Sequence, residues 1–226
     1  MIVPQTASLF PPPESADEDG IVALSRSLNC AMLADAYRHG IFPWPFGEDA
    51  AFIPWASPER RGVLFCDDLH IPKSFQRELK KNRFTFKVDT AFEEVITNCA
   101  RAERPGQDDT WITSEMIKVY CEFHRLHYAH SFEAYDENGV LAGGLYGISV
   151  GKIFCGESMF FRVSGASKFA FVKMVEFLKS RGVVLIDTQM VTNATAAFGA
   201  RLISRDEYLL LLEQYGGDPL DFTEAL

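Results

Sequence analysis

The 226-residue sequence contains no apolar run long enough to cross a bilayer. Its first twenty residues lack the basic start and apolar stretch of a secretory signal. The five cysteines are scattered singly and form no CxxC pair, which argues against a disulfide framework and a structural zinc site. These absences predict a cytoplasmic protein with no metal, no cofactor and no membrane partner.

Positive charge is also scarce, because 22 Lys and Arg residues face 31 Asp and Glu residues and give a formal net charge of −9. Such a chain repels polyanions on average, so any contact with nucleic acid must be local. The one dense basic cluster is 77-RELKKNR-83, which includes Lys80, Lys81 and Arg83. A solvated helix face is the alternative interpretation of this cluster.

Hydrophobic residues make up 47% of the chain, enough for a full core. The segment 41–61 holds four prolines together with Trp44 and Trp55, which predicts an aromatic loop with no regular helix or central strand. This loop marks a predicted boundary: residues 1–62 form a small N-terminal domain, and residues 63–226 form the larger domain.

Helical and strand patterns interleave after residue 62. Asn138 and Gly139 separate two strand-like runs and predict a hairpin. An apolar strand over 152–160, a long helix over 165–182 and a strand over 183–190 follow. Interleaved elements with a hairpin among them predict an α/β (α+β) fold with a mixed sheet, not a regular doubly wound one.

Two of these strands carry carboxylates where core residues are expected. Glu157 interrupts 153-IFCGESMFF-161, and Asp187 interrupts 185-LIDTQM-190 with Gln189 two residues further along. Residues two apart on a strand face the same side, and buried carboxylates are usually paired or functional. We therefore expect the three side chains to meet in one apolar site, with a structural hydrogen-bond network as the alternative.

Other motifs are less specific. Trp111 precedes a predicted helix over 114–128 and is either the wall of an aromatic pocket or a hydrophobic plug. His124, His127 and His130 are three residues apart, but no acidic residue nearby completes a familiar ligand set. The stretch 162-RVSGAS-167 loosely matches the pyrophosphate loop of acetyl-CoA-dependent acetyltransferases and departs from it at the last position.

Several stretches in order resemble the leucyl/phenylalanyl-tRNA–protein transferases of bacteria: 37-YRHGIFPW-44, 110-TWIT-113, 126-LHYAHSFE-133, 143-GGLYG-147, 154-FCGESMF-160, 166-ASK-168 and 185-LIDTQ-189. The resemblance implies a small N-terminal domain joined to an acetyltransferase-like (GNAT-type) mixed-sheet domain. It also implies that Leu, Phe and sometimes Met pass from aminoacyl-tRNA to an N-terminal Arg or Lys of a protein, which marks that protein for degradation by the N-end rule.

The resemblance also implies residue roles. Asp187 and Gln189 match the catalytic pair, and Glu157 matches the carboxylate of the FCGESMF stretch. Residues expected around the aminoacyl-adenosine are Trp44, Trp111 and Tyr120, and those expected around the donor side chain are Phe154, Gly156, Met159 and Ile186. Lys80, Lys81 and Arg83 are predicted to touch the tRNA backbone without reading its sequence.

Three other functions remain open from the sequence. The stretch 162-RVSGAS-167 and the fold suit an acetyl-CoA-dependent N-acetyltransferase. A non-catalytic module that binds basic N-termini would leave Trp44, Trp111 and the 185-LIDTQ-189 pair without a donor to hold. Phe161 and the stretch 194-ATAAFGA-200 depart from the family pattern, which keeps a transferase of altered acceptor specificity as the third alternative.

Overall fold

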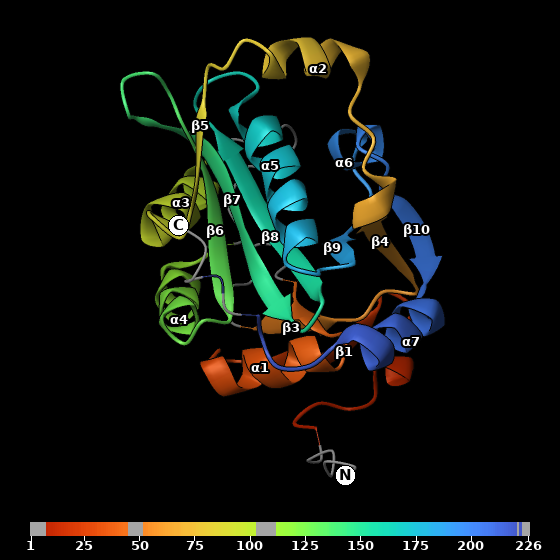
Figure 1. The fold of residues 1–226 in the computed structure, drawn as a ribbon. Helices are drawn as coiled ribbons and strands as arrows, with labels where there is room; N and C mark the ends of the chain where they lie inside the picture. The colour runs from red at the N-terminus through yellow and green to blue at the C-terminus, as the bar shows by residue number, and fades with distance from the viewer. Residues whose placement is uncertain (1–7, 45–51, 103–111, 221, 223–226) are drawn as a thin grey trace.

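A computed structural model describes residues 8–44, 52–102, 112–220 and 222 (Figure 1). Its main element is a sheet of seven strands, in the order β10 (Arg201–Ser204), β4 (Arg60–Phe65), β9 (Leu185–Gln189), β8 (Ile153–Phe161), β7 (Leu141–Val150), β6 (Ala129–Tyr135) and β5 (Thr85–Val88). Only β8 and β9 run parallel; every other neighbouring pair is antiparallel. The expected mixed-sheet α/β class is confirmed.

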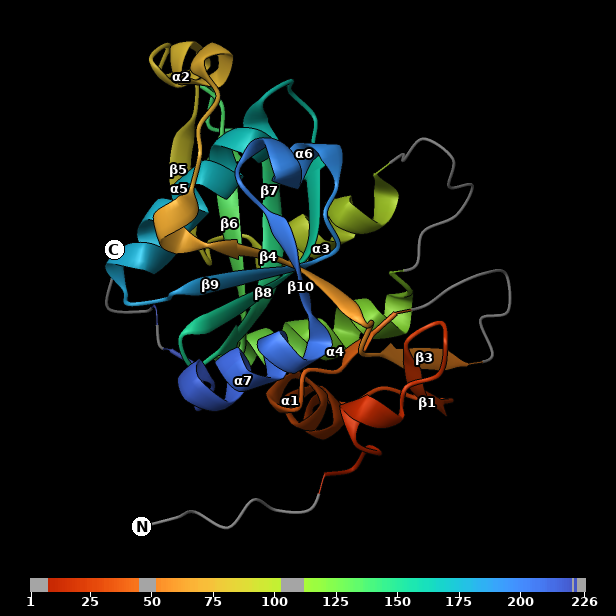
Figure 2. The same cartoon turned by 90° about the vertical axis from the view of Figure 1, so that its right-hand side faces the viewer.

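Helices cover both faces of this sheet (Figures 1 and 2). On one face α5 (Ala166–Ser180) packs against β6, β7 and β8. On the other face α3 (Phe92–Arg101) packs against the same three strands, and α4 (Ser114–Arg125) packs against β6 and α3. Two hydrophobic cores result, one on each face. The β8–α5–β9 connection joins the one parallel pair, which is the acetyltransferase-like arrangement that the resemblance implies.

The remaining helices lie around the ends of the sheet: α1 (Cys30–Arg38), α2 (Lys73–Leu79), α6 (Asn193–Ala197) and α7 (Arg205–Tyr215). Helices α1 and α7 lie at one end, and α2 and α6 lie at the other (Figure 2). Asn29 caps α1 by accepting a hydrogen bond from the Met32 N–H, and Gly40 follows it with a φ of 75°. Two short 3₁₀ turns span Pro13–Ser15 and Cys66–Asp68.

The proline-rich segment forms more regular structure than its composition predicts. Strands β1 (Ile21–Ser25), β3 (Ile53–Ala56) and β2 (Phe42–Pro43) form a second sheet in that order, with β3 at its centre. The prediction that proline excludes a central strand here was wrong. The Pro54 carbonyl accepts a hydrogen bond from the Trp44 N–H, just past the end of the two-residue strand β2. The missing N–H of Pro54 faces the same side, so proline removes a hydrogen bond only beyond the end of β2 and is tolerated there.

The hairpin predicted at Asn138 and Gly139 is confirmed. It joins β6 to β7, and Gly139 has a φ of 75°, which a side chain would disfavour. Asp136 closes the turn by accepting hydrogen bonds from the Asn138 and Val140 N–H groups through its Oδ1. Local turn chemistry therefore decides this connection.

The parallel pair β8 and β9 holds together over only part of its length. The paired residues are Ile153 with Leu185, Phe154 with Ile186 and Cys155 with Asp187, although β8 continues to Phe161 and β9 to Gln189. Beyond Cys155 and Asp187 the two strands have no mutual pairing, so the sheet opens there. This opening lies at the centre of the sheet, flanked by α5 and α6.

The predicted domain boundary at residue 62 stays a prediction. Residue 62 falls inside β4, which pairs with β9 and β10. One hydrophobic core also includes residues from both sides, such as Trp55 and Tyr120. Within the described ranges, no helix is long and apolar enough to span a membrane.

Candidate active site

Glu157, Asp187 and Gln189 lie together where β8 and β9 separate. The Gln189 side-chain Nε2 donates a hydrogen bond to Glu157 Oε1 at 2.8 Å. The Gln189 backbone N–H donates to Asp187 Oδ1, also at 2.8 Å. The strand pattern led us to expect this convergence, and the catalytic roles of the three residues stay predictions.

A β-bulge aims Glu157 into the site. Tyr146 of β7 pairs with Ser158, and the next residue, Gly147, pairs with Gly156, so Glu157 is the extra residue on β8. A bulge of this kind redirects a side chain and increases the local twist, and bulges are common beside active sites. Glu157 therefore points toward the tyrosines of the first core, and β8 twists away from β9.

Asp187 is fully buried and fully engaged. Arg61 on β4 donates to it through Nε at 2.9 Å to Oδ1 and through Nη2 at 2.7 Å to Oδ2. The Tyr208 hydroxyl on α7 donates to Oδ2 at 2.9 Å, and the Gln189 N–H occupies Oδ1. With no exposed surface and every oxygen occupied, Asp187 is placed to hold Gln189 and not to meet a substrate.

Arg61 is as deeply buried as its partner. Its guanidinium lies between the Phe42 and Tyr208 rings, 4.3 and 4.4 Å from their centroids. Its Nη1 donates to the Gly40 carbonyl at 3.2 Å. Burial alone would lower the pKa of Arg61, but the neighbouring Asp187 carboxylate raises it above its usual value. The pair therefore stays ionised in the core.

Glu157 differs from Asp187 in both access and pKa. Its side chain and that of Gln189 are partly exposed, whereas Asp187 is not exposed. Desolvation raises the pKa of Glu157 to about 8, although hydrogen bonds from Tyr37 and Tyr120 oppose the rise. A carboxyl with a pKa near neutrality, open to solvent on one side, is suited to exchange a proton with a ligand.

Two tyrosines support Glu157 from behind. The Tyr120 hydroxyl donates to Glu157 Oε2 at 3.4 Å, and it lies 2.9 Å from the Tyr37 hydroxyl. Both tyrosines are buried, and burial, followed by the charge of Glu157, raises the pKa of each well above its usual value. They therefore remain hydroxyl donors at physiological pH.

Gln189 carries a second signature of a functional site. Its φ is 59°, which is uncommon for a residue other than glycine. Local backbone strain of this kind concentrates at active sites. Its side-chain Nε2 makes the hydrogen bond to Glu157. Within the described part of the chain its side-chain Oε1 has no hydrogen-bond partner. That oxygen can accept a hydrogen bond from a ligand.

Arg61, Tyr37 and Tyr208 are residues that our sequence analysis missed. A signal for Arg61 exists in the sequence: a carboxylate inside an apolar strand requires a buried cation, and Arg61 directly precedes the apolar run 62–66. Tyr37 and Tyr208 have no comparable signal, because each lies on a helix whose pattern accounts for it as core.

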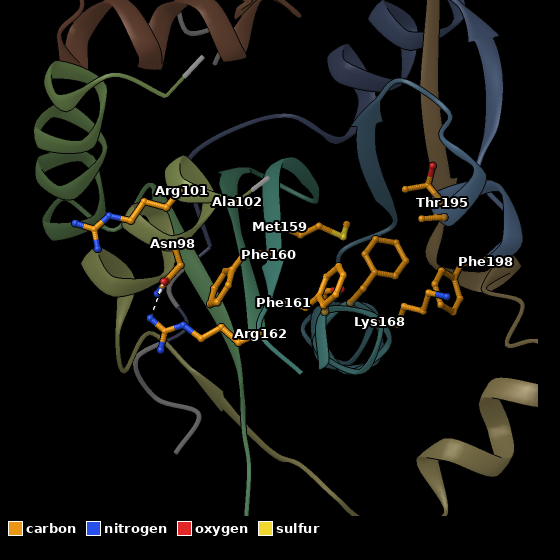
Figure 3. A pocket seen from close by; sticks show the side chains of 13 residues that line it. Asn98, Arg101, Ala102, Met159, Phe160, Phe161, Arg162, Lys168, Thr195 and Phe198 are labelled. Atoms are coloured by element: carbon orange, nitrogen blue, oxygen red, sulfur yellow. Dashed lines mark hydrogen bonds between the residues drawn. The ribbon is translucent and has the colours of Figure 1, made fainter. Parts of the chain in front are cut away.

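A cavity of about 710 Å³ lies along the end of β8 (Figure 3), and Glu157, Asp187 and Gln189 are not among the residues that line it. Its lining comes from β8, the start of α5, the end of α3, and α6. Of the predicted donor-pocket residues, Met159 lines it. Phe154 and Ile186 pack in the second core with almost no exposure, and Gly156 lies near the Asp187 carbonyl. Their contact with a donor stays a prediction.

The remaining predicted site residues are spread more widely. Trp44 is half-buried, 5.3 Å from the Phe42 ring that covers Arg61. Trp111 lies outside the described residues. Lys80, Lys81 and Arg83 are exposed at the end of α2 and just after it. Helix α2 approaches the cavity, because Phe75 packs on Phe198 of its lining.

The histidine cluster gains an acidic neighbour in the structure. Asp89, from a distant segment, comes within ligand distance of His124 and His130. The His130 ring nitrogens lie 2.7 Å from Asp89 Oδ2 and 3.1 Å from the His127 carbonyl, and His124 Nδ1 faces the Ala129 carbonyl at 2.7 Å. These nitrogens already have oxygen partners, so hydrogen bonding accounts for the cluster, and the absence of a metal stays a prediction.

The mixed sheet opens between its two parallel strands, over an accessible carboxyl and amide that a buried ion pair holds in place. The model of the family described as leucyl/phenylalanyl-tRNA protein transferase matches residues 63–213. The chain belongs to this family, whose members are aminoacyltransferases.

Curated relatives agree with the family model. A leucyl/phenylalanyl-tRNA–protein transferase of Anaeromyxobacter dehalogenans (strain 2CP-C) is 48% identical over 203 residues, which cover 90% of this chain and 86% of the relative. One of Chromobacterium violaceum is 46% identical over 208 residues, with 91% and 88% covered. The solved structure of L-PGS from Bacillus licheniformis aligns at a TM-score of 0.45 and 10% identity over 71% of this chain and 66% of that one, too low to support an inference.

Proposed function

We propose that the protein transfers leucine and phenylalanine, and methionine as a further donor residue, from charged tRNA to the N-terminal Arg or Lys of acceptor proteins. The transfer marks those proteins for degradation by the N-end rule, in the cytoplasm where charged tRNA is used. One observation carries the proposal: an accessible Gln189–Glu157 pair lies at the opening of the sheet, held in place by buried Asp187 and Arg61.

The reaction joins an α-amine to an activated ester. The amine nitrogen attacks the ester carbonyl carbon, an amide bond forms, and the bond to the ribose oxygen breaks. One proton passes from the amine to that oxygen. The α-amine has a reference pKa of about 8, so a useful neutral fraction exists near pH 7. Alignment of amine and ester then supplies most of the rate, roughly 7–11 kcal/mol of barrier.

Gln189 and Glu157 have complementary roles in this proposal. Gln189 Oε1, which has no partner among the described residues, accepts a hydrogen bond from the incoming amine and orients its lone pair. Glu157 takes the proton and returns it to the departing ribose oxygen, because its pKa of about 8 matches that of the amine. Asp187 and Arg61 act as positioning residues, since neither is exposed.

Donor selection follows from the shape of the pocket beside Met159. A side chain that is unbranched at Cβ, such as Leu, Phe or Met, enters a narrow slot more easily than Val or Ile. One methyl group is worth only about 1–3 kcal/mol in such pockets, so discrimination requires a tight neck. The overall charge of −9 favours a cationic acceptor, which supports Arg and Lys over acidic N-termini.

The test is to incubate the protein with labelled leucyl-tRNA and peptides that begin with Arg, Lys, Asp or Glu. We expect label to move to the Arg and Lys peptides only. Transfer to the acidic peptides would instead indicate the same transferase with altered acceptor specificity. Acetylation of the peptides from labelled acetyl-CoA, with no transfer from tRNA, would contradict the proposal.

A further inference from the structure

The cavity that Met159 lines has three basic side chains along an otherwise largely apolar lining. Arg101, Arg162 and Lys168 line it, and none of its described lining residues is an acid, although Glu94 lies 3.7 Å from Arg162 (Figure 3). This is unexpected in a chain of net charge −9. A concave site that gathers cations and excludes acids favours an anionic ligand. The cationic acceptor residue of the proposed reaction does not fit this requirement, so the basic part of the cavity serves the donor, whose side chain enters the apolar part beside Met159.

The N-terminus of α5 opens on the same cavity. Gly165, with a φ of 88°, precedes the helix, no side chain caps it, and its first turn holds no acidic residue. Within the described residues the Ser167 and Lys168 N–H groups have no acceptor. Free N–H groups and the helix dipole at this end of a helix attract negative charge. The fifteen-residue length of α5 gives the dipole its full effect.

Ser167 provides an independent indication of a ligand. Its side chain is only 7% exposed and lines the cavity. The Ser167 Oγ has no hydrogen-bond partner within the described ranges, and it is open to the cavity instead of being sealed in the core. An oxygen-rich ligand in the cavity would supply the missing acceptor.

Arg162 is held ready at the rim. Its Nη2 donates to Asn98 Oδ1 at 2.7 Å, and its Nη1 lies 3.7 Å from Glu94 Oε1, so α3 fixes the guanidinium (Figure 3). Phe161, beside it in the sequence, is 64% exposed and also lines the cavity. A fixed guanidinium next to an exposed ring fits a ligand that carries both a phosphate and an aromatic base.

We propose that Ser167, Lys168 and the first-turn amides of α5, together with Arg162, bind the phosphodiester next to the aminoacylated nucleoside of the donor. This inference rests on the proposed transfer from tRNA. Met159 lines the cavity two residues along β8 from Glu157, roughly 7 Å away. A phosphate at α5 therefore leaves the ester of the adjoining nucleoside within reach of Glu157 and Gln189.

The test compares two unreactive donor analogues in which an amide replaces the ester: 3′-leucylamino-3′-deoxyadenosine, and the same molecule with a 5′-phosphate. Their dissociation constants are measured by calorimetry for the wild-type protein, Ser167→Ala and Lys168→Gln. We expect the 5′-phosphate to tighten binding to the wild-type protein. In each variant the gain in affinity from the phosphate should be about tenfold smaller. Binding of the unphosphorylated analogue should stay unchanged, because only the phosphate contacts are removed.

Lys173→Gln is the matched control, since Lys173 is on α5 but outside the cavity and pairs with Glu176 at 2.8 Å. This control should keep the wild-type preference for the phosphate. Equal binding of the two analogues by the wild-type protein, or equal weakening of both by Ser167→Ala and Lys168→Gln, would overturn the inference. Tighter binding of coenzyme A than of either analogue would overturn it too, because the phosphates would then be those of a cofactor.

The outcomes for the two proposals are distinguishable. The rate of leucyl transfer from tRNA is also measured at subsaturating donor in Ser167→Ala and Lys168→Gln. If both variants keep the wild-type rate, the phosphate site is overturned and the proposed function stands. Failure of the wild-type protein to transfer leucine, together with a retained phosphate preference, overturns the function and leaves an anion site in the cavity.

Discussion

Replacing Glu157 by Gln should remove a pH-dependent part of the protein's stability. Burial raises the pKa of Glu157 from 4.5 to about 8 in the folded protein. The folded state therefore favours the neutral carboxyl. Its contribution to stability is fully present below pH 4.5 and is lost as the pH rises toward 8. Glutamine is always neutral and keeps nearly the same shape, so the variant lacks this dependence.

The magnitude follows from the size of the rise. Each pKa unit is worth about 1.36 kcal/mol, so a full shift of this size corresponds to about 5 kcal/mol, most of which falls between pH 5 and pH 8. Glu157 is partly exposed, and solvent screening reduces this value. We expect the free energy of unfolding of the wild-type protein to fall by about 2–3 kcal/mol relative to Glu157→Gln over this range.

Urea denaturation at pH 5, 6, 7 and 8 measures the effect. Burial also raises the pKa of Glu133, to about 7, and it titrates in the same range with the same sign. Glu133 is present in both proteins, so its contribution cancels in the difference between the wild-type protein and Glu157→Gln. A Glu133→Gln background provides the control, because the difference should persist there. A difference that stays constant within about 0.5 kcal/mol from pH 5 to 8 would refute the reasoning.

Other predictions follow from the same site and from the basic cluster. Arg61→Leu should lower the free energy of unfolding by about 3–5 kcal/mol, since it leaves buried Asp187 without its cation, and a loss below about 1 kcal/mol by chemical denaturation would contradict this. Asp187→Asn should lower the transfer rate and shift its pH profile toward lower pH, because Asp187 positions Gln189 and its negative charge helps to raise the pKa of Glu157; an unchanged rate and profile would remove it from the mechanism. Lys81→Glu should weaken tRNA binding and reduce its salt dependence, whereas Lys152→Glu on another surface should not; an unchanged salt dependence in Lys81→Glu would show that the tRNA backbone lies elsewhere.

Local patterns were sufficient for many parts of the fold. The turn residues Asn138 and Gly139 have the backbone preferences of a hairpin, and the hairpin is where they predict it. Asn29 and Gly40 bound α1 for similar reasons. Local patterns failed at Pro54, because the cost of a missing N–H depends on which neighbouring strand that group would face. That neighbour is a matter of sheet assembly and not of local preference.

The candidate site divides in the same way. Carboxylates in two apolar strands, at Glu157 and Asp187, point to a buried polar site from the sequence alone, since such groups are too costly to bury without a partner. The partner of Asp187 is Arg61, which is 126 residues away in the chain, and no local pattern reports that distance. Nothing in the sequence indicates that Glu157 is partly exposed to solvent while Asp187 is fully buried.

The sequence by itself determined the family, the mixed-sheet class and the choice of Glu157, Asp187 and Gln189, because each depends on residue types at short spacings. Only the tertiary structure decided that Asp187 is sealed behind Arg61 while Glu157 stays partly exposed, and that three basic side chains line one cavity with Met159. The physical reason is that pairing of β8 with β9 stops after three residues and a bulge directs Glu157 toward Tyr120 and Gln189. Burial, charge balance and pKa are set by such neighbours, which come together only when the chain folds.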